Sequence, residues 1–212
     1  MLHWYDLIPI VSFLMLGAQC RYCKKSISWK YPFIEAVTAL CSVLVVTSLA
    51  PLPISALLAL SIVVFAFLLI AFYDFETKNI PDIFIAIAFL AALLFQTFVA
   101  EVSDGSSLRD AFLGAAVPFA FFGGLWLFSR GGWIGSGDIL LGVTIGLFLG
   151  FKLTLLALFL SYIGGACVAL FLLLSGRAQS KSRLAFGPFL SGSALLALFF
   201  GDTLLHWYQQ LA

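Results

Sequence analysis

The sequence predicts an all-α polytopic membrane protein with about seven transmembrane helices, an N-terminus in the cytoplasm and a C-terminus outside. Of the 212 residues, 63% are hydrophobic and only 10% are charged. With a mean hydropathy of +1.13, the chain has too little polar surface to cover a soluble globule. Several apolar stretches approach the ~20 residues that cross a bilayer as a helix. Helices suit a membrane because they pair every backbone polar group internally.

The chain is expected to divide into a short N-terminal segment and a transmembrane domain. Residues 1–31 are predicted to be cytoplasmic or interfacial, because the apolar stretch 4–17 contains Pro9 and is too short to cross a bilayer. Residues 32–212 are predicted to form the transmembrane domain. Its expected spans, in chain order, are 32–50, 54–73, 81–100, 108–128, 138–150, 152–174 and 186–208.

The fifth of these spans is unusually short. About 13 residues lie between its start at Asp138 and the next charge at Lys152, fewer than the ~20 needed to cross. A helix of this length would begin below the lipid headgroups. We therefore expect Asp138 to be recessed within the membrane, beside a cleft that admits water.

Lys and Arg in the loops predict the orientation, because cytoplasmic loops carry an excess of positive charge. With the N-terminal segment in the cytoplasm, nine basic residues lie inside and two outside. The reverse orientation would put the nine on the unfavourable side. The nine are Arg21, Lys24, Lys25, Lys30, Lys78, Arg130, Arg177, Lys181 and Arg183, and the two are Arg109 and Lys152.

Two aspartates lie where apolar segments meet water, and an ionisable side chain at bilayer depth is by default a functional hypothesis. Asp74 ends the second span and Asp138 begins the fifth. The predicted order and orientation of the spans therefore place both aspartates at the cytoplasmic face. Two close carboxylates cannot both ionise cheaply, so one holds a proton while the other stays charged. The charged one can deprotonate water while the neutral one polarises a carbonyl.

Helix ends suggest a role for each aspartate. An anion is favoured at the start of a helix and disfavoured at its end, so Asp138 is predicted to be the resting base and Asp74 the resting acid. The other acidic residues are interpreted as solvated helix ends, and Asp82 as a cap on the helix that follows Pro81. These residues are Glu76, Asp82, Asp104, Asp110 and Asp202.

Glycines surround Asp138. Gly135 and Gly137 flank Ser136 immediately before it. Glycine permits otherwise forbidden turns and close approach of another chain, so a peptide could lie against this loop as a strand adds to a sheet edge. Gly142, Gly146 and Gly150 then follow at four-residue intervals. This small-xxx-small pattern lets helices approach closely and predicts that the face carrying Asp138 looks into the protein.

Five ordered blocks closely resemble the type IV prepilin peptidases, bacterial members of the GxGD intramembrane aspartyl proteases. The blocks run along nearly the whole chain. They are Trp4–Pro9 with Ser12-Phe13; Cys20-Arg21-Tyr22-Cys23 with Ile27-Ser28, Tyr31-Pro32 and Glu35; Asp74 with Ile80-Pro81-Asp82; Gly135–Asp138; and Phe186–Leu190.

The resemblance implies an aspartic endopeptidase of the bacterial cytoplasmic (inner) membrane. Such enzymes remove the leader from type IV prepilins and type II secretion pseudopilins at the cytoplasmic face, with catalytic aspartates at the positions of Asp74 and Asp138. The peptidase reaction requires no cofactor. Many family members also methylate the new N-terminal amine with S-adenosylmethionine. Pro81, Asp82, Gly187 and Pro188 are expected to line the substrate site, although Gly187-Pro188 would equally serve to start the last helix.

The chain departs from the family pattern in two places. Four-cysteine members carry a further N-terminal helix and a first Cys-x-x-Cys, which are missing here, so a truncated form or a late start codon is expected and methylation is uncertain. Cys20 and Cys23 remain as a half-site for zinc, which takes four ligands; His3 or a second copy in a homodimer are alternatives for completing it. Leu140 replaces a common lysine, which would weaken stabilisation of an anionic Asp138.

Two other functions remain open at this point. A proton- or cation-coupled transporter could use the two aspartates as a relay, but it should show internal repeats and broken helices near the midplane. An inactive membrane scaffold is the second alternative. The expected partners are the lipid bilayer and a prepilin or pseudopilin. No nucleic-acid partner is expected, because the net charge is only +1 and no basic patch occurs.

Overall fold

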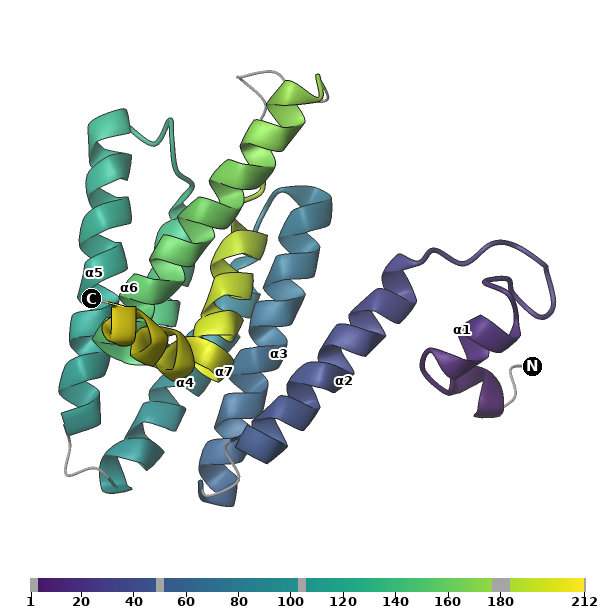
Figure 1. Ribbon diagram of the computed structural model, residues 1–212, viewed down its shortest axis with the longest axis horizontal. Helices are drawn as coiled ribbons and strands as arrows, with labels where there is room; N and C mark the ends of the chain where they lie inside the picture. The colour runs from purple at the N-terminus through teal and green to yellow at the C-terminus, as the bar shows by residue number, and fades with distance from the viewer. Residues whose placement is uncertain (1–3, 49–51, 103–105, 177–183, 212) are drawn as a thin grey trace. The chain divides into compact units, whose positions relative to one another are not determined.

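The structure is a computed structural model that describes residues 4–48, 52–102, 106–176 and 184–211. Within these ranges the chain is helical apart from loops and one isolated β-bridge between Gln19 and Ser26. Six helices are long and apolar enough to cross a membrane, so the predicted all-α polytopic fold is confirmed. The elements are η1 (Trp4–Leu7), α1 (Val11–Met15), α2 (Lys30–Ser48), α3 (Ile54–Thr77), α4 (Asp82–Val102), α5 (Ser106–Ser129), α6 (Ser136–Leu174) and α7 (Gly187–Leu211) (Figure 1).

The predicted fifth and sixth spans are the two halves of α6. Inside this 39-residue helix, Gly150 has φ 75° and ψ 179°, which is not helical. We call residues 136–149 the first arm of α6 and residues 151–174 the second arm. The two arms form a V in Figure 1. At 1.5 Å per residue the first arm is only about 21 Å long, shorter than the ~30 Å hydrocarbon core.

The chain forms two compact units, Met1–Ser48 and Leu49–Ala212. In the first unit, Phe13 is buried and packs edge-on against Trp29, with ring centroids 4.8 Å apart. The guanidinium of Arg21 lies 2.8 Å from the carboxylate of Asp6. This unit contains α2, whereas the predicted transmembrane domain, 32–212, also includes most of α2. The functional boundary at residue 31 stays a prediction.

The second unit is a bundle of α3 to α7. Its core is formed largely by α3, whose side chains Leu60, Val63 and Phe67 are fully buried. The loops α3–α4 and α5–α6 lie at the upper end of this bundle in Figure 1, and the first arm of α6 descends from that end. The last turn of α4 and the first turn of α5 lie at the opposite end. Two loops that are far apart in sequence are therefore neighbours.

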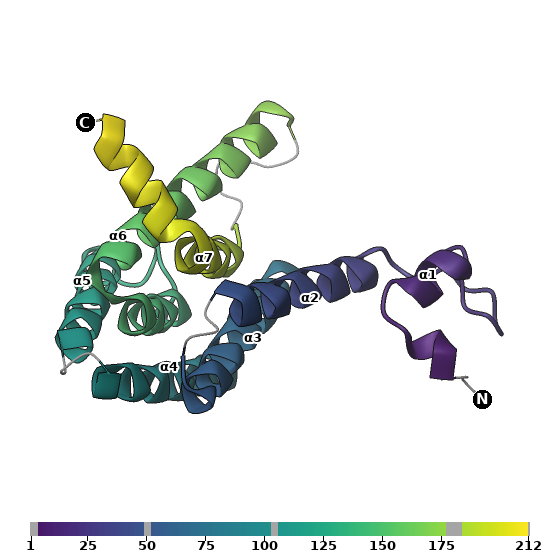
Figure 2. The same ribbon diagram turned by 60° about the horizontal axis from the view of Figure 1, so that its bottom comes forward.

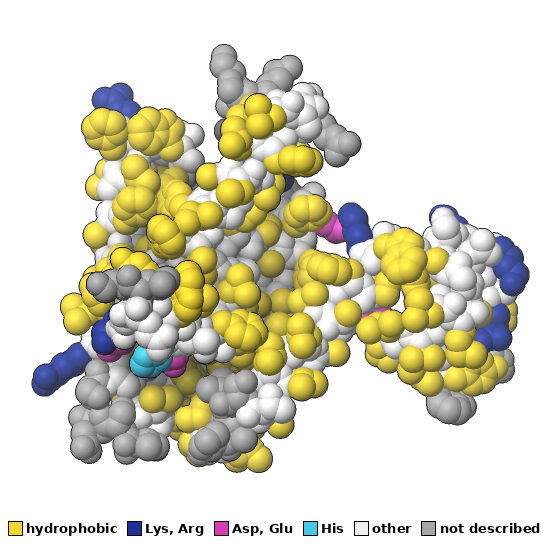
Figure 3. All heavy atoms as spheres, in the orientation of Figure 1, with side chains coloured by type: hydrophobic (Ala, Val, Ile, Leu, Met, Phe, Trp, Pro, Cys, Tyr) yellow, Lys and Arg dark blue, Asp and Glu magenta, His cyan; other side chains and the backbone are white. Residues whose placement is uncertain are grey.

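The outer surface of the helices is apolar. Hydrophobic side chains cover most of the face seen in Figure 3, and Leu127 and Phe128 are 71% and 83% exposed. A soluble protein rarely exposes such a continuous apolar surface. Contact with lipid tails explains it.

Helices α5 and α6 are held close by glycine, as the four-residue spacing predicted. A Cβ at Gly142 would lie 2.7 Å from the ring of Phe122, and a Cβ at Gly146 would collide with the backbone carbonyl of Gly114. At Gly150 the positive φ combined with an extended ψ is a conformation that essentially only glycine adopts. Each glycine of the series therefore has a steric reason to be there.

We expect Gly146→Ala to destabilise the protein by about 1–3 kcal/mol, because the added methyl group meets backbone that cannot move aside. Thermal unfolding in detergent micelles measures the change. Gly124→Ala is the matched control on α5, since a Cβ there meets nothing within 4 Å. The control should be neutral or gain about 0.5–1 kcal/mol from the better helix propensity. Equal losses in both variants would contradict the close-packing explanation.

Candidate active site

Asp74 is buried in the last turn of α3, with only 4% of its surface exposed. Its Oδ2 accepts a 2.9 Å hydrogen bond from the backbone N–H of Gly187, the first residue of α7. That N–H belongs to the first turn of a helix, where backbone donors have no partner within the helix. The positive end of α7 therefore faces the Asp74 carboxylate.

Gly187 is at this position because nothing larger fits. A Cβ would lie 2.6 Å from Oδ2 of Asp74 and 3.1 Å from its Cγ. The structure confirms that Gly187-Pro188 begins the last helix, with Pro188 where its missing N–H is tolerated. The contact between Gly187 and Asp74 spans 113 residues of sequence, and no local pattern indicates it.

Asp138 is the third residue of α6, and its Oδ2 accepts a 3.4 Å hydrogen bond from the backbone N–H of Gly135. This is the reciprocal half of a capping box, in which an acidic side chain reaches back to the residue before the helix. The side chain is half-buried. The structure thus places Asp138 at a helix start, as predicted.

The forbidden turn expected of the glycines in this loop is wrong, whereas the close approach of a peptide stays a prediction. Gly135 has φ −76° and ψ 152°, an ordinary extended conformation. A Cβ at Gly137 would make only ordinary contact, at 3.5 Å, with Ile80. The left-handed residues of the loop are instead Arg130 and Gly131, with φ 52° and 76°. The turn is made before Gly135, which is itself extended, and α6 begins at the next residue, Ser136.

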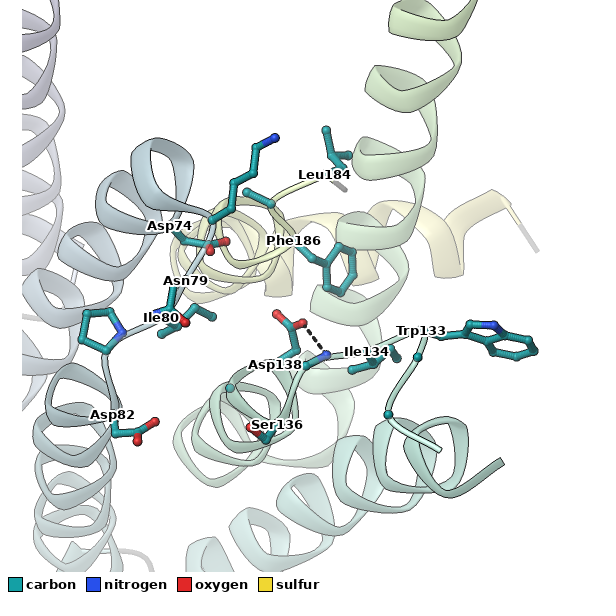
Figure 4. Close-up of a pocket in the computed structure, with 17 residues that line it drawn as sticks. Asp74, Asn79, Ile80, Asp82, Trp133, Ile134, Ser136, Asp138, Leu184 and Phe186 are labelled. Atoms are coloured by element: carbon teal, nitrogen blue, oxygen red, sulfur yellow. Dashed lines mark hydrogen bonds between the residues drawn. The ribbon is translucent and has the colours of Figure 1, made fainter. Parts of the chain in front are cut away.

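A cavity of about 930 Å³ joins the two aspartates. Figure 4 shows the carboxylates of Asp74 and Asp138 pointing into the same space from different elements, with the ring of Phe186 beside them. The cavity walls come from the α3–α4 loop, the α5–α6 loop and the segment before α7. The lining residues are Asp74, Lys78, Asn79, Ile80, Pro81, Asp82, Gly131, Gly132, Trp133, Ile134, Gly135, Ser136, Gly137, Asp138, Leu184, Ala185 and Phe186.

Most of the predicted site residues meet in this cavity. Pro81 and Asp82 line it, as does the whole Gly135–Gly137 loop, whereas Gly187 and Pro188 are not among the lining residues. Sequence reasoning did not identify Lys78 or Trp133 as lining residues. The signal for both was their loop position, adjacent in sequence to the segments that carry Asp74 and Asp138.

Both aspartates face the start of a helix. Their positions at helix ends therefore do not decide which is the resting acid and which the resting base. Asp74 ends α3 but also accepts the first N–H of α7. Asp138 accepts an N–H at the start of α6. One difference is exposure, because Asp138 is half-buried whereas Asp74 is almost fully buried. The assignment of Asp138 as base therefore stays a prediction, supported by its better access to cavity water.

Leu140 does not contribute to the cavity lining. Its side chain is 50% exposed, and residues two apart on a helix do not face each other. The expected loss of stabilisation of an anionic Asp138 at this position stays a prediction.

Cys20 and Cys23, the predicted half-site for zinc, lie in a turn of the first unit. Cys20 N–H donates to Lys25 O at 2.9 Å, and Lys24 N–H donates to Cys20 O at 3.0 Å. Hydrogen bonds from the backbone N–H groups of Cys23 and Tyr22 lower the pKa of the Cys20 thiol below its ordinary value. Structural zinc takes four ligands, and the described residues contain no group of three or more metal-binding side chains. Residue His3 lies outside the described ranges.

Comparison with known proteins places the chain among bacterial leader peptidases. A family model described as "Type IV leader peptidase family" matches residues 60–170, and a model described as "Bacterial Peptidase A24 N-terminal domain" matches residues 1–49. No solved structure matches the chain.

Three relatives, from different bacteria, are each named prepilin leader peptidase/N-methyltransferase. The Aeromonas hydrophila protein is 31% identical over 95% of this chain and 69% of its own length. The Bacillus subtilis protein is 33% identical over 98% of this chain and 81% of its own length. The Pseudomonas aeruginosa protein is 30% identical over 98% of this chain and 71% of its own length.

We expect Gly187→Ala to destabilise the protein by about 1–3 kcal/mol, because its methyl group would overlap the Asp74 carboxylate. Asp74→Ala should relieve this overlap. In a double-mutant cycle measured by thermal unfolding, the two losses should therefore add to more than the loss in the double variant. Gly192→Ala on the same helix is the control, since a Cβ there meets nothing within 4 Å. Strict additivity of Gly187→Ala and Asp74→Ala would show that the contact is not formed.

Proposed function

Because the chain belongs to the type IV leader peptidase family, we propose that it is a membrane aspartic endopeptidase with Asp74 and Asp138 as its catalytic pair. Its substrates would be type IV prepilins or type II secretion pseudopilins, from which it removes the leader at the cytoplasmic face. The observation that carries the proposal is the shared cavity, into which two carboxylates from distant parts of the chain both point.

Asp74 and Asp138 together can supply the proton transfers that hydrolysis of a peptide bond requires. The Asp138 carboxylate removes a proton from a cavity water as the water oxygen bonds to the scissile carbonyl carbon. The protonated Asp74 donates a hydrogen bond to the carbonyl oxygen and then the proton itself, which gives a tetrahedral diol. Asp138 passes its new proton to the leaving nitrogen as the C–N bond breaks. One diol hydroxyl returns a proton to Asp74 as the carboxylic acid product forms, which restores the starting state.

The cavity suits an extended peptide. The segment before Asp138 is extended at Gly135, becomes helical from Ser136, and lines the cavity through Gly135 and Gly137. Its small side chains leave the backbone accessible to a substrate strand, which could pair with it by main-chain hydrogen bonds. Apolar walls at Ile80, Ile134 and Phe186 would hold side chains next to the cleaved bond.

N-methylation is a separate question. The relatives carry "N-methyltransferase" in their names, and S-adenosylmethionine would supply the methyl group. The lining of the described cavity has three carboxylates, Asp74, Asp82 and Asp138, and one basic side chain, Lys78, and this charge neither selects nor excludes a cofactor with a net positive charge. The proposal therefore covers the peptidase reaction alone.

The geometry of the site does not support the transporter alternative. A relay needs carboxylates reachable from both sides of the membrane in turn. Asp74 and Asp138 instead share one cavity at one end of the helical bundle.

We expect Asp74→Asn and Asp138→Asn each to lower the rate of leader removal by about 10²–10⁴-fold, because an amide can neither take nor give the proton. The measurement is co-expression with a prepilin-like substrate, followed by a gel that separates the cut and uncut forms. Asp202→Asn, an exposed acid on α7, is the control and should cut normally. An uncut substrate with the wild type would refute the peptidase activity, and normal cutting by either active-site variant would refute the pair.

We also expect the cavity to open to the cytoplasm. Alkaline phosphatase fused after Arg109 should be active, because this residue is predicted to lie outside, whereas fusions after Asn79 or Gly132 should be inactive. Fusions of a cytoplasmic fluorescent protein at the same positions should give the opposite pattern. Active phosphatase after Asn79 would reverse the orientation and with it the proposed side of cleavage.

A further inference from the structure

Breaking α6 at Gly150 leaves backbone groups to be paired. In a continuous helix the N–H of Phe151 would donate to the carbonyl of Leu147 four residues earlier. The dihedral angles of Gly150 turn the second arm away from that direction. Within a membrane, unpaired backbone groups cost several kcal/mol each, so both halves of the lost hydrogen bond need new partners.

Side chains from two other helices supply these partners. The N–H of Phe151 donates to Oδ2 of Asp110 on α5 at 3.2 Å. The carbonyls of Leu147 and Phe148 accept hydrogen bonds from Nε2 of Gln96 on α4, at 3.0 and 2.8 Å. Asp110 was interpreted from sequence as a solvated helix end, and this interpretation is wrong in one respect. The side chain is exposed, but it caps the second arm of α6.

Burial and a further hydrogen bond hold the Gln96 side chain in this position. It is only 6% exposed, and its Oε1 accepts a 2.7 Å hydrogen bond from the hydroxyl of Ser107 on α5. Both of its N–H groups and its oxygen are thus paired, which a buried amide requires. The two carbonyls can only accept, so they also determine which way the amide is turned. We call Gln96 and Asp110 the α6 brace.

The brace is distant from the cavity but acts on the helix that carries Asp138. Asp138 lies 12 residues before Gly150, which is about 18 Å along the first arm. A tilt of about 5° at the break would therefore move Asp138 by about 1.5 Å. Displacements of about 1 Å at a catalytic group cost on the order of 10²-fold in rate.

The first arm of α6 is in contact with both α5 and α4. Gly142 and Gly146 bring the first arm against α5, whereas Gln96 connects its lower end to α4. Helix α4 begins at Asp82 on the cavity wall and also packs along α3, which carries Asp74. Gln96 thus joins the helix of one aspartate to a neighbour of the helix of the other.

We propose that Gln96 and Asp110 are positioning residues, which re-pair the backbone at Gly150 and thereby hold the first arm at the angle that brings Asp138 to Asp74. The inference rests on the proposed peptidase function. Neither residue is among those that line the cavity, so their loss should lower kcat and leave KM nearly unchanged.

The test compares variants that remove a hydrogen bond with variants that keep it. Gln96→Leu removes both donors at similar volume, and Asp110→Ala removes the acceptor. Asp110→Asn keeps an acceptor oxygen and should restore activity. We expect Gln96→Leu and Asp110→Ala to lower kcat about 10- to 100-fold with KM within about twofold. Thr97→Val is the control next to Gln96, since its hydroxyl bonds only Leu94 of its own helix.

Rates are measured per folded molecule, on monodisperse protein well below its unfolding temperature. An unchanged kcat in both variants, even with a lower Tm, would mean that the brace only stabilises the fold, and the proposal would be wrong. Equal losses in Asp110→Asn and Asp110→Ala would likewise overturn it. Should Gln96→Leu fail to fold, the two Asp110 variants still decide the question, because this side chain is exposed.

A readout without catalysis separates this proposal from the peptidase function. Hydrogen exchange at the Phe151 amide should be faster in Asp110→Ala than in the wild type and unchanged in Asp110→Asn. Unchanged exchange in Asp110→Ala would refute the brace whatever the activity. Normal cutting by Asp74→Asn or Asp138→Asn would instead refute the catalytic pair while the exchange result stands.

Discussion

Backbone N–H groups at helix starts are the constraint on which the rest of the structure depends. An apolar environment offers them no water, so each must find an acceptor in the protein. Three aspartates provide that acceptor at three different helix starts. Asp74 pairs with Gly187 at the start of α7, Asp138 pairs with Gly135 before α6, and Asp110 pairs with Phe151 at the start of the second arm.

This shared arrangement accounts for both stability and chemistry. A carboxylate at the positive end of a helix is stabilised as an anion, which offsets the cost of placing it among apolar side chains. Asp110 uses this stabilisation only to terminate a break in α6. Asp74 and Asp138 accept their N–H groups beside a cavity that is large enough for a peptide. What separates the proposed catalytic pair from Asp110 is therefore the cavity and not the hydrogen bond.

The parts of the site that were predictable are those encoded by local patterns. The cost of Asp74 and Asp138 at the ends of apolar runs, the four-residue spacing of Gly142 and Gly146, and the shortness of the fifth span are all visible within about 20 residues of sequence. Gln96 and Gly187 were not predictable in this way. Their partners lie 51 and 113 residues away, and a lone glutamine or a helix-starting glycine carries no local signal of such a contact.

The two catalytic candidates are held in different ways, which determines what can disturb them. Asp138 bonds to the loop of its own helix, so this contact moves with the first arm of α6. Asp74 bonds to another helix, so its orientation depends on the packing of α3 against α7. The separation of the pair is therefore a property of the whole bundle. Substitutions at packed positions far from the cavity should alter catalysis by changing how the helices meet, without any change in the residues that touch the substrate.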